Sequence, residues 1–348
     1  MTRVRTLVRS HLVLAALSLV AIVLVLTAVD DFRAVQLTQM AYLALAAGGL
    51  TVLTGLNGQI SLGHGALMAI GAYTTALLLQ DADPALPLLA ILVVATVVTL
   101  AVGALIGVAA ARLHGPYLAG ATLALAVAVP GIALFFGDTL GGEQGLRVRV
   151  PQAPEWLLDA AFFVTGEDLT PSKYVAYVGW LTLVVGYVGL ANLARSRTGR
   201  RWRAVRDDEV AASIAGISLG RARVSAFVVS AAAAGAAGFV MALTVRLAAP
   251  SGFTLTLSLT LLTAVVIGGL GSLTGALAGA GLLTFLPQVV TDAGVAAGLD
   301  DIRAAELAPL VYGLVLVAVI LLAPSGLVGS LRIAWLRHRT TTAKGGTT

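Results

Sequence analysis

The sequence has few charged residues for its length, and this deficit indicates what kind of solvent surrounds the chain. Asp, Glu, Lys and Arg make up 11% of the 348 residues, whereas 58% are hydrophobic. Soluble globular domains carry roughly 25% charged residues. The few charges gather in short clusters between long apolar runs, as expected of a chain that lies in the lipid bilayer.

Cysteine is absent and histidine is scarce, which excludes several kinds of chemistry. Without cysteine the chain has no disulfides, no thiolate nucleophiles and no zinc sites built on sulfur. The four histidines lie far apart and form no HExxH motif, so we expect no metal site. A GxxxxGKS/T phosphate loop is also absent. We therefore expect the chain neither to be an enzyme nor to bind ATP or another cofactor itself.

Long apolar runs predict an all-α, polytopic transmembrane helical bundle. A helix that crosses about 30 Å of hydrocarbon needs roughly 20 mostly apolar residues. We interpret the first such run as a retained anchor rather than a signal peptide, because its apolar stretch is long and no A-x-A-like cleavage site follows. Ten runs meet the length rule: 11–29, 36–55, 61–79, 87–111, 117–137, 174–194, 223–245, 255–270, 272–291 and 304–323.

Clusters of arginine predict how the bundle is oriented, because basic loops stay on the cytoplasmic side. The N-terminus, the run 195–206 and the tail 331–348 are basic. The segment 138–173 is acidic and should face outward, either as a surface loop or as a contact surface for a soluble partner. Ten passes satisfy these assignments. They place both termini in the cytoplasm of a bacterial inner membrane, with one membrane domain over 1–330.

Two glycine-rich stretches interrupt the apolar runs and predict broken helices. Residues 55–65 read GLNGQISLGHG, and residues 268–275 read GGLGSLTG. Backbone that is freed from a helix at membrane depth has to line a cavity or be buried in protein. The alternative is that these glycines only allow helices to pack closely.

The cytoplasmic run 199–223 (GRRWRAVRDDEVAASIAGISLGRAR) predicts a short helix after a basic cluster. The acids 207–209 stand at its expected first turn, where they oppose the helix dipole favourably, and Gly216 can end it. Val210 and Ile214, at i, i+4 spacing, would share an exposed apolar face that suits a partner's cleft. The alternative is a juxtamembrane linker that its arginines hold at the lipid headgroups.

Several segments resemble those of one family of transport proteins. EVAASIAG (209–216) resembles the EAA loop of ABC import permeases. GLNGQISLGHG, LHGPYLAGATLAL and VVIGGLGSLTG resemble, in this order, three signatures of the branched-chain amino acid permeases of the LivH/LivM type. With LGGEQGL (140–146) and PSGL near Pro324, they cover most of residues 41–328. Their order and the acidic outer segment favour the LivM-like member.

The resemblance implies a membrane-spanning permease subunit of an ATP-driven importer that moves branched-chain amino acids by alternating access. It implies as partners a second homologous permease, which is the same or a different chain, two cytoplasmic ATPase subunits, and a periplasmic or lipid-anchored substrate-binding protein. The ATPase would bind ATP and contact the coupling loop 195–222. The residues implied in coupling are Asp207, Asp208, Glu209, Val210, Ala211, Ala212, Ile214 and Gly216.

The same resemblance places the translocation path at the two glycine-rich breaks. Among the lining residues, His64 is either a structural hydrogen-bonding group or a substrate ligand. The residues implied in the path are Asn57, Gln59, Ser61, His64, Gly268, Gly269, Gly271 and Ser272.

Two departures from the family's pattern leave the substrate open. Leu67 and Met68 follow the SLGH motif where aromatic residues are usual, and Val127 stands where an intramembrane Glu is common. Urea and short-chain amides are therefore alternative substrates. A secondary transporter that works alone is a further alternative, although such carriers usually keep a mid-membrane acid, which the ten runs almost lack. The broken spans disfavour a plain membrane anchor or scaffold.

Overall fold

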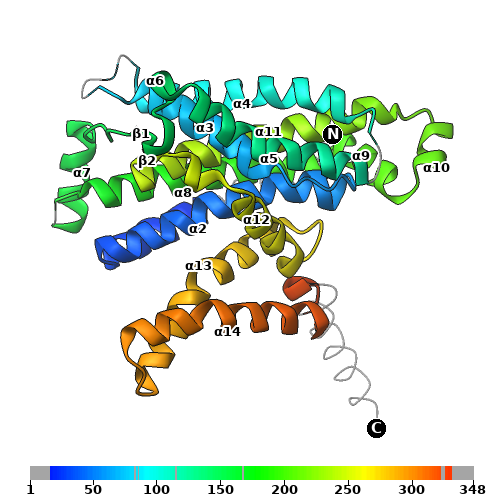
Figure 1. Ribbon diagram of the computed structural model, residues 1–348. Helices are drawn as coiled ribbons and strands as arrows, with labels where there is room; N and C mark the ends of the chain where they lie inside the picture. Colours follow the sequence, from blue (N-terminus) through cyan, green and yellow to red (C-terminus); the bar gives the residue numbers. More distant parts are fainter. Residues whose placement is uncertain are drawn as a thin grey trace, which may run out of the picture.

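The described part of the chain is a bundle of helices that run mainly along one axis (Figure 1). The computed structural model describes residues 16–330, apart from 82, 83, 85, 114, 115, 167 and 323–325. Within these residues the only strands are two of two residues each, so the all-α prediction is confirmed. The basic tail 331–348, the arginines before residue 16 and Pro324 lie outside the described residues.

Ten helices of the described part coincide with the ten predicted membrane spans. Three are the helix Ala16–Ala28, the short α3 (His64–Leu78) and α14 (Asp301–Leu322). The other seven are long and apolar enough to cross a membrane: α2 (Asp31–Leu50) with its π-helical extension η1 (Thr51–Leu56), α4 (Leu88–Ala110), α5 (Pro116–Phe135), α8 (Pro171–Arg195), α11 (Leu219–Val245), α12 (Leu255–Gly268) with the 3-10 turn η3 (Pro250–Phe253) before it, and α13 (Leu273–Ala296).

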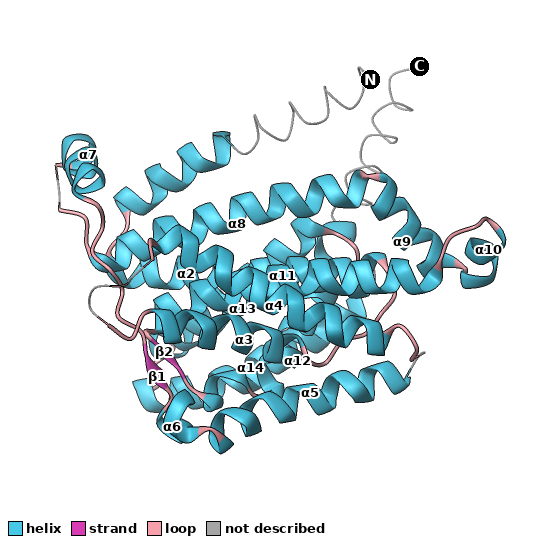
Figure 2. Cartoon of the chain, turned by 90° about the horizontal axis from the view of Figure 1, so that it is seen from above, coloured by secondary structure: helices cyan, strands magenta, loops and turns pink. Residues whose placement is uncertain are grey.

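The helix α11 lies in the middle of the bundle (Figure 2), and its composition explains this position. It contacts α2, α3, α4 and α8, and residues 231–238 read AAAAGAAG. Small residues let the backbones of membrane helices approach closely. A Cβ added at Gly238 would lie 2.1 Å from the carbonyl oxygen of Met68 on α3, so this crossing requires glycine.

The segment 138–173, predicted as a loop, instead folds into short elements. These are α6 (Gly137–Leu140), the 3-10 turn η2 (Gly142–Gln144), the strand β1 (Leu146–Arg147) and α7 (Glu155–Thr165). The strand β1 pairs antiparallel with β2 (Leu247–Ala248), which follows α11 and precedes the 3-10 turn η3 (Pro250–Phe253). The sequence pattern missed this because the partner strand lies a hundred residues further along the chain.

The two ends of the bundle carry different elements. In Figure 1, α6, α7 and the strands lie at one end, and α9 (Arg197–Asp207) and α10 (Glu209–Ile214) lie at the other. The acidic segment and the basic coupling loop are therefore on opposite sides of the molecule, as the arginine pattern predicts.

Candidate functional site

The short helix α10 is capped at its N-terminus by an aspartate. The Oδ1 atom of Asp208 accepts hydrogen bonds from the backbone N–H groups of Val210 at 2.8 Å and Ala211 at 3.0 Å. Glu209 is therefore the first helical residue. The prediction was wrong for Asp207, which is the last residue of α9 rather than part of the first turn of α10. The reason is that the chain becomes extended at Asp208, between the two helices.

Gly216 ends α10 in the left-handed conformation, with φ of +79°. The N–H of Gly216 donates to the carbonyl oxygen of Ser213 at 3.0 Å, and the N–H of Ile217 donates to that of Ala212 at 3.0 Å. This pair of bonds is a Schellman motif, which residues with a Cβ adopt reluctantly. Ala212 is the one residue of α10 that is buried. The helix is therefore capped at both ends and packs on the bundle through one face.

Val210 and Ile214 form an exposed apolar pair on α10, which we call the α10 knob. Their side chains are 69% and 82% exposed. Because they are four residues apart, they lie on the same face of the helix. A helix that holds two large apolar side chains in water at the end of the bundle suits insertion into a cleft of another protein.

The basic run before α10 forms a helix, α9, that packs on the bundle. The Oγ atom of Ser196 caps it by accepting a hydrogen bond from the N–H of Thr198 at 3.1 Å. Trp202 is fully buried, and its indole N–H donates to Oγ of Ser225 on α11 at 2.9 Å. Val205, three residues further on, is also buried. The helix α9 is therefore attached to the central helix of the bundle.

The two glycine-rich breaks are far apart in the sequence but meet in the bundle. A Cβ added at Gly55, in η1, would lie 2.3 Å from the backbone nitrogen of Gly271. Gly269 and Gly271 have positive φ, and a Cβ added at Gly326 would lie 2.3 Å from Cα of Gly269. The helices are broken at both stretches, as predicted. Close packing of backbones accounts for Gly55, and backbone conformation for Gly269 and Gly271.

The second break also holds the start of α13. The Oγ atom of Ser272 accepts a hydrogen bond from the N–H of Gly275 at 3.0 Å and so caps this helix. A Cβ added at Gly268, the last residue of α12, would lie 1.9 Å from the carbonyl oxygen of Gly275. A larger residue there would push α12 and α13 apart.

The polar side chains of the first break are buried, and some of their atoms are unpaired. Asn57, Gln59, Ser61 and His64 are each exposed by 5% or less. The Nε2 N–H of His64 donates to the carbonyl oxygen of Ala46 at 3.0 Å, so His64 joins α3 to α2 as a structural hydrogen-bonding group. Nδ2 of Asn57, Oε1 of Gln59 and Nδ1 of His64 have no partner among the described residues. Each such atom costs about 1–3 kcal/mol, so this region suits contact with a further polar group.

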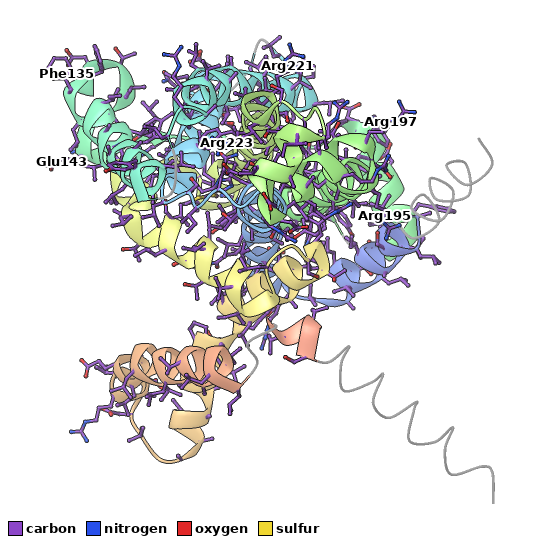
Figure 3. All side chains as sticks on the ribbon, turned by 90° about the vertical axis from the view of Figure 1, so that its right-hand side faces the viewer. Phe135, Glu143, Arg195, Arg197, Arg221 and Arg223 are labelled. Atoms are coloured by element: carbon purple, nitrogen blue, oxygen red, sulfur yellow. The ribbon has the colours of Figure 1, made fainter. Side chains whose placement is uncertain are left out.

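Arg223, which the sequence analysis did not single out, connects α10 to the membrane helices. It lies near the start of α11 and is 6% exposed. Its Nη2 lies 2.5 Å from Oε1 of Glu209, and its Nη1 donates to the carbonyl oxygen of Ala111 after α4 at 3.2 Å. Its own carbonyl oxygen accepts a hydrogen bond from Nε2 of Gln59 at 3.1 Å. Figure 3, which views the α9–α10 end, shows Arg223 inside the outline of the bundle and Arg197 near its edge.

Arg206, at the end of α9, reaches the first break. Its Nη1 donates to the carbonyl oxygen of Gly55 at 2.7 Å, and its Nη2 lies 2.7 Å from Oδ1 of Asp207. The sequence held a signal for Arg223, since a charge at the start of an apolar span needs a partner. It held none for Arg206, because that residue is one of six arginines in the same basic run.

An apolar groove of about 820 Å³ lies elsewhere, between α4 and α8. Its lining includes Leu92 of α4, Val185 of α8, Ala232 and Ala236 of α11, and Trp156 of α7. None of the predicted site residues lines it. In a membrane bundle such a surface faces apolar surroundings, so it does not identify the path of a polar solute.

Comparison with known proteins identifies relatives that cover most of the chain. The sequence profile of a family described as the permease component of the branched-chain amino acid transport system matches residues 34–320. The chain is 34% identical over 268 residues to the high-affinity branched-chain amino acid transport system permease protein LivM of Salmonella typhimurium. This match covers 73% of the chain and 62% of that relative, so the chain spans about three fifths of its length.

Two shorter relatives are matched over almost their whole length. The permease protein BraD of Pseudomonas aeruginosa is 29% identical over 297 residues, which is 82% of this chain and 91% of BraD. The permease protein LivH of Escherichia coli is 28% identical over the same shares of the two chains. No solved structure matches the chain.

Proposed function

Because the chain belongs to the family of branched-chain amino acid transport permeases, we propose that it is the membrane-spanning permease subunit of an ATP-driven importer of branched-chain amino acids. The observation that carries this proposal is the α10 knob: two apolar side chains, 69% and 82% exposed, on a helix capped at both ends. The sequence contains no phosphate-binding loop, so the energy would come from ATPase subunits that bind this knob.

The proposed assembly contains a second homologous permease, two cytoplasmic ATPase subunits and a substrate-binding protein on the outer side. Curated relatives include both LivM and LivH permeases, which supports pairing of two homologous chains. The elements of 138–173 lie at the end of the bundle opposite to α10, which supports docking of the binding protein there. In this orientation both termini lie in the cytoplasm.

The proposed translocation path passes the two glycine-rich breaks. The unpaired polar atoms of Asn57, Gln59 and His64 support this, because each would gain a hydrogen bond from a polar neighbour in the assembled transporter. ATP-driven approach of the two ATPase subunits would move the α10 helices of the two permeases together. The pair would then alternate between inward-facing and outward-facing states around the breaks.

The substrate proposal favours branched-chain amino acids over urea and short-chain amides. Leu67 and Met68, the departures that raised the alternative, are fully buried within the chain. They therefore contribute to the packing of α3, and their apolar side chains offer no hydrogen-bonding group to a solute. Val127 on α5 is 66% exposed and is the departure that still bears on substrate choice.

The test is uptake by proteoliposomes that contain the complete complex. We expect ATP-dependent uptake of leucine, isoleucine and valine that excess urea does not compete with, and neither transport nor ATP hydrolysis by the purified chain alone. In the complex, the double variant Val210→Asp with Ile214→Asp should abolish ATPase binding, whereas Ala215→Asp, an exposed position at the end of α10 that is turned away from the knob, should not. Normal uptake in the knob variant would overturn the proposal.

A further inference from the structure

We propose that Arg206 and Arg223 are positioning residues that connect α10 to the membrane region at two separate points, Arg206 at the break of α2 and Arg223 at the end of α4. This inference rests on the proposed function, because it assumes that ATPase subunits move α10. It goes further by naming the contacts through which that movement reaches the two glycine-rich breaks.

The contact of Arg206 with the first break is specific in geometry. Its Nη1 donates to the carbonyl oxygen of Gly55 at 2.7 Å, and that carbonyl belongs to the π-helix η1. A Cβ added at Gly58 would lie 3.0 Å from Cγ of Arg206, so the stem of the arginine also packs on the turn after η1. The guanidinium is a rigid fork, and its other arm is held by Asp207, next to the cap of α10.

The movement that reaches Gly55 would also reach the second break. Gly55 is in backbone contact with Gly271, where an added Cβ would lie only 2.3 Å away from the nitrogen. No flexible side chain lies between these two backbones. A displacement of Arg206 would therefore be passed to both breaks, because closely packed protein interiors transmit strain.

Arg223 makes a second, independent connection. Its buried guanidinium joins Glu209, the first residue of α10, to the carbonyl oxygen of Ala111, while its backbone oxygen holds Gln59. A buried arginine requires such partners, since an unpaired charge there is costly. Arg223 alone is therefore bonded to the start of α10, the end of α4 and the first break.

The same helix provides a matched control. Arg203, also on α9, donates through Nη1 to the carbonyl oxygen of Ala194 on α8 at 3.0 Å. The variants Arg203→Gln and Arg206→Gln each remove a charge and one arginine-to-backbone hydrogen bond from the same helix, and Arg206→Gln also removes the exposed ion pair with Asp207. Only the second affects a bond to a break.

The experiment uses the complete complex in proteoliposomes and two readouts, leucine uptake per ATP hydrolysed and maleimide labelling of Leu270→Cys. The chain has no other cysteine, and Leu270 is 58% exposed in the second break. In the parent complex we expect the labelling rate to differ between the ATP-free and the vanadate-trapped state. Arg206→Gln should lower uptake per ATP by about tenfold and abolish this difference, and Arg206→Lys, which keeps a donor, should restore part of both. Arg203→Gln should behave as the parent.

The Arg223 connection is tested with Glu209→Gln and Arg223→Gln combined, since this double variant leaves no unpaired buried ion. We expect the same loss of uptake per ATP. If Arg206→Gln and the double variant both match Arg203→Gln while the knob variant is uncoupled, this inference is wrong and the proposed function stands. If the knob variant itself stays coupled, the proposed function fails.

Discussion

At the scale of single residues, glycine has two different roles at the sites described here. At Gly216 it supplies a left-handed backbone, with φ of +79° and no neighbour within 4 Å of an added Cβ. At Gly238 and Gly55 it supplies room for another backbone. At Gly220 it meets neither requirement, because φ is not positive and no atom lies nearby. Substitutions at these positions should therefore have effects of different kinds.

Gly216→Val should uncouple ATP hydrolysis from transport while the permease stays folded. The replacement costs about 1 kcal/mol or more in the left-handed region, and the end of α10 would fray. Uptake and binding-protein-stimulated ATPase activity in proteoliposomes measure the effect. Gly216→Asn should retain more coupling, because Asn tolerates this conformation, and Gly220→Val is the control. Equal coupling in all three variants would contradict the importance of this cap.

Gly238→Val should instead destabilise the bundle. Its Cβ would lie 2.1 Å from the carbonyl oxygen of Met68, so α11 and α3 would have to separate. Overpacking of this kind typically costs about 1–3 kcal/mol, and here the contact is with backbone that cannot rotate away. The measurement is the apparent melting temperature in detergent. Gly120→Val on α5, where nothing lies within 4 Å, is the matched control, and an equal shift in both would be evidence against close packing.

At the scale of secondary-structure elements, the attachment of α9 decides where α10 stands. The knob helix has only six residues, and its buried contact is Ala212. The position of α10 depends mainly on the packing of α9, whose residues Trp202 and Val205 are buried in the bundle. A short helix cannot transmit force unless such an anchor prevents it from rotating freely.

Trp202→Ala should release α9 from α11. Truncating a buried Trp typically costs about 3–5 kcal/mol, so we expect a lower melting temperature and loss of coupling. Trp202→Phe keeps most of the packing but loses the hydrogen bond to Ser225, worth about 0.5–1.5 kcal/mol, and should be milder. Thermal unfolding and uptake per ATP measure both. If Trp202→Ala leaves coupling intact, α9 is not the anchor of the knob.

At the scale of the whole molecule, the arrangement of the elements makes the orientation testable. Asp168, which follows α7, and Ser213 of α10 are both exposed, and Figure 1 shows α7 and α10 at opposite ends of the bundle. In intact spheroplasts an impermeant maleimide should label Asp168→Cys but not Ser213→Cys, and permeabilisation should make both react. If only Ser213→Cys were labelled in intact cells, the chain would have the opposite orientation in the membrane.

The sequence by itself determined the features that depend on local chemistry. Apolar length is a property of each run, so the ten spans could be located one by one. Arginine clusters placed 195–206 and 138–173 at opposite ends. The end of α10 followed from Gly216, and its start lies within two residues of the predicted one, since helix-end signals involve residues within four positions of each other.

Only the tertiary structure decided which distant groups meet. Arg206 and Gly55 are 151 positions apart, and Arg223 lies 164 positions from Gln59. Nothing in the run RSRTGRRWRAVR distinguishes Arg206, which contacts η1, from Arg200 and Arg203, which contact α8. The burial of Trp202 and the contact of Gly55 with Gly271 likewise depend on how whole helices pack. Side-chain partners are set by the crossing of helices, whereas sequence patterns report only neighbours along one helix.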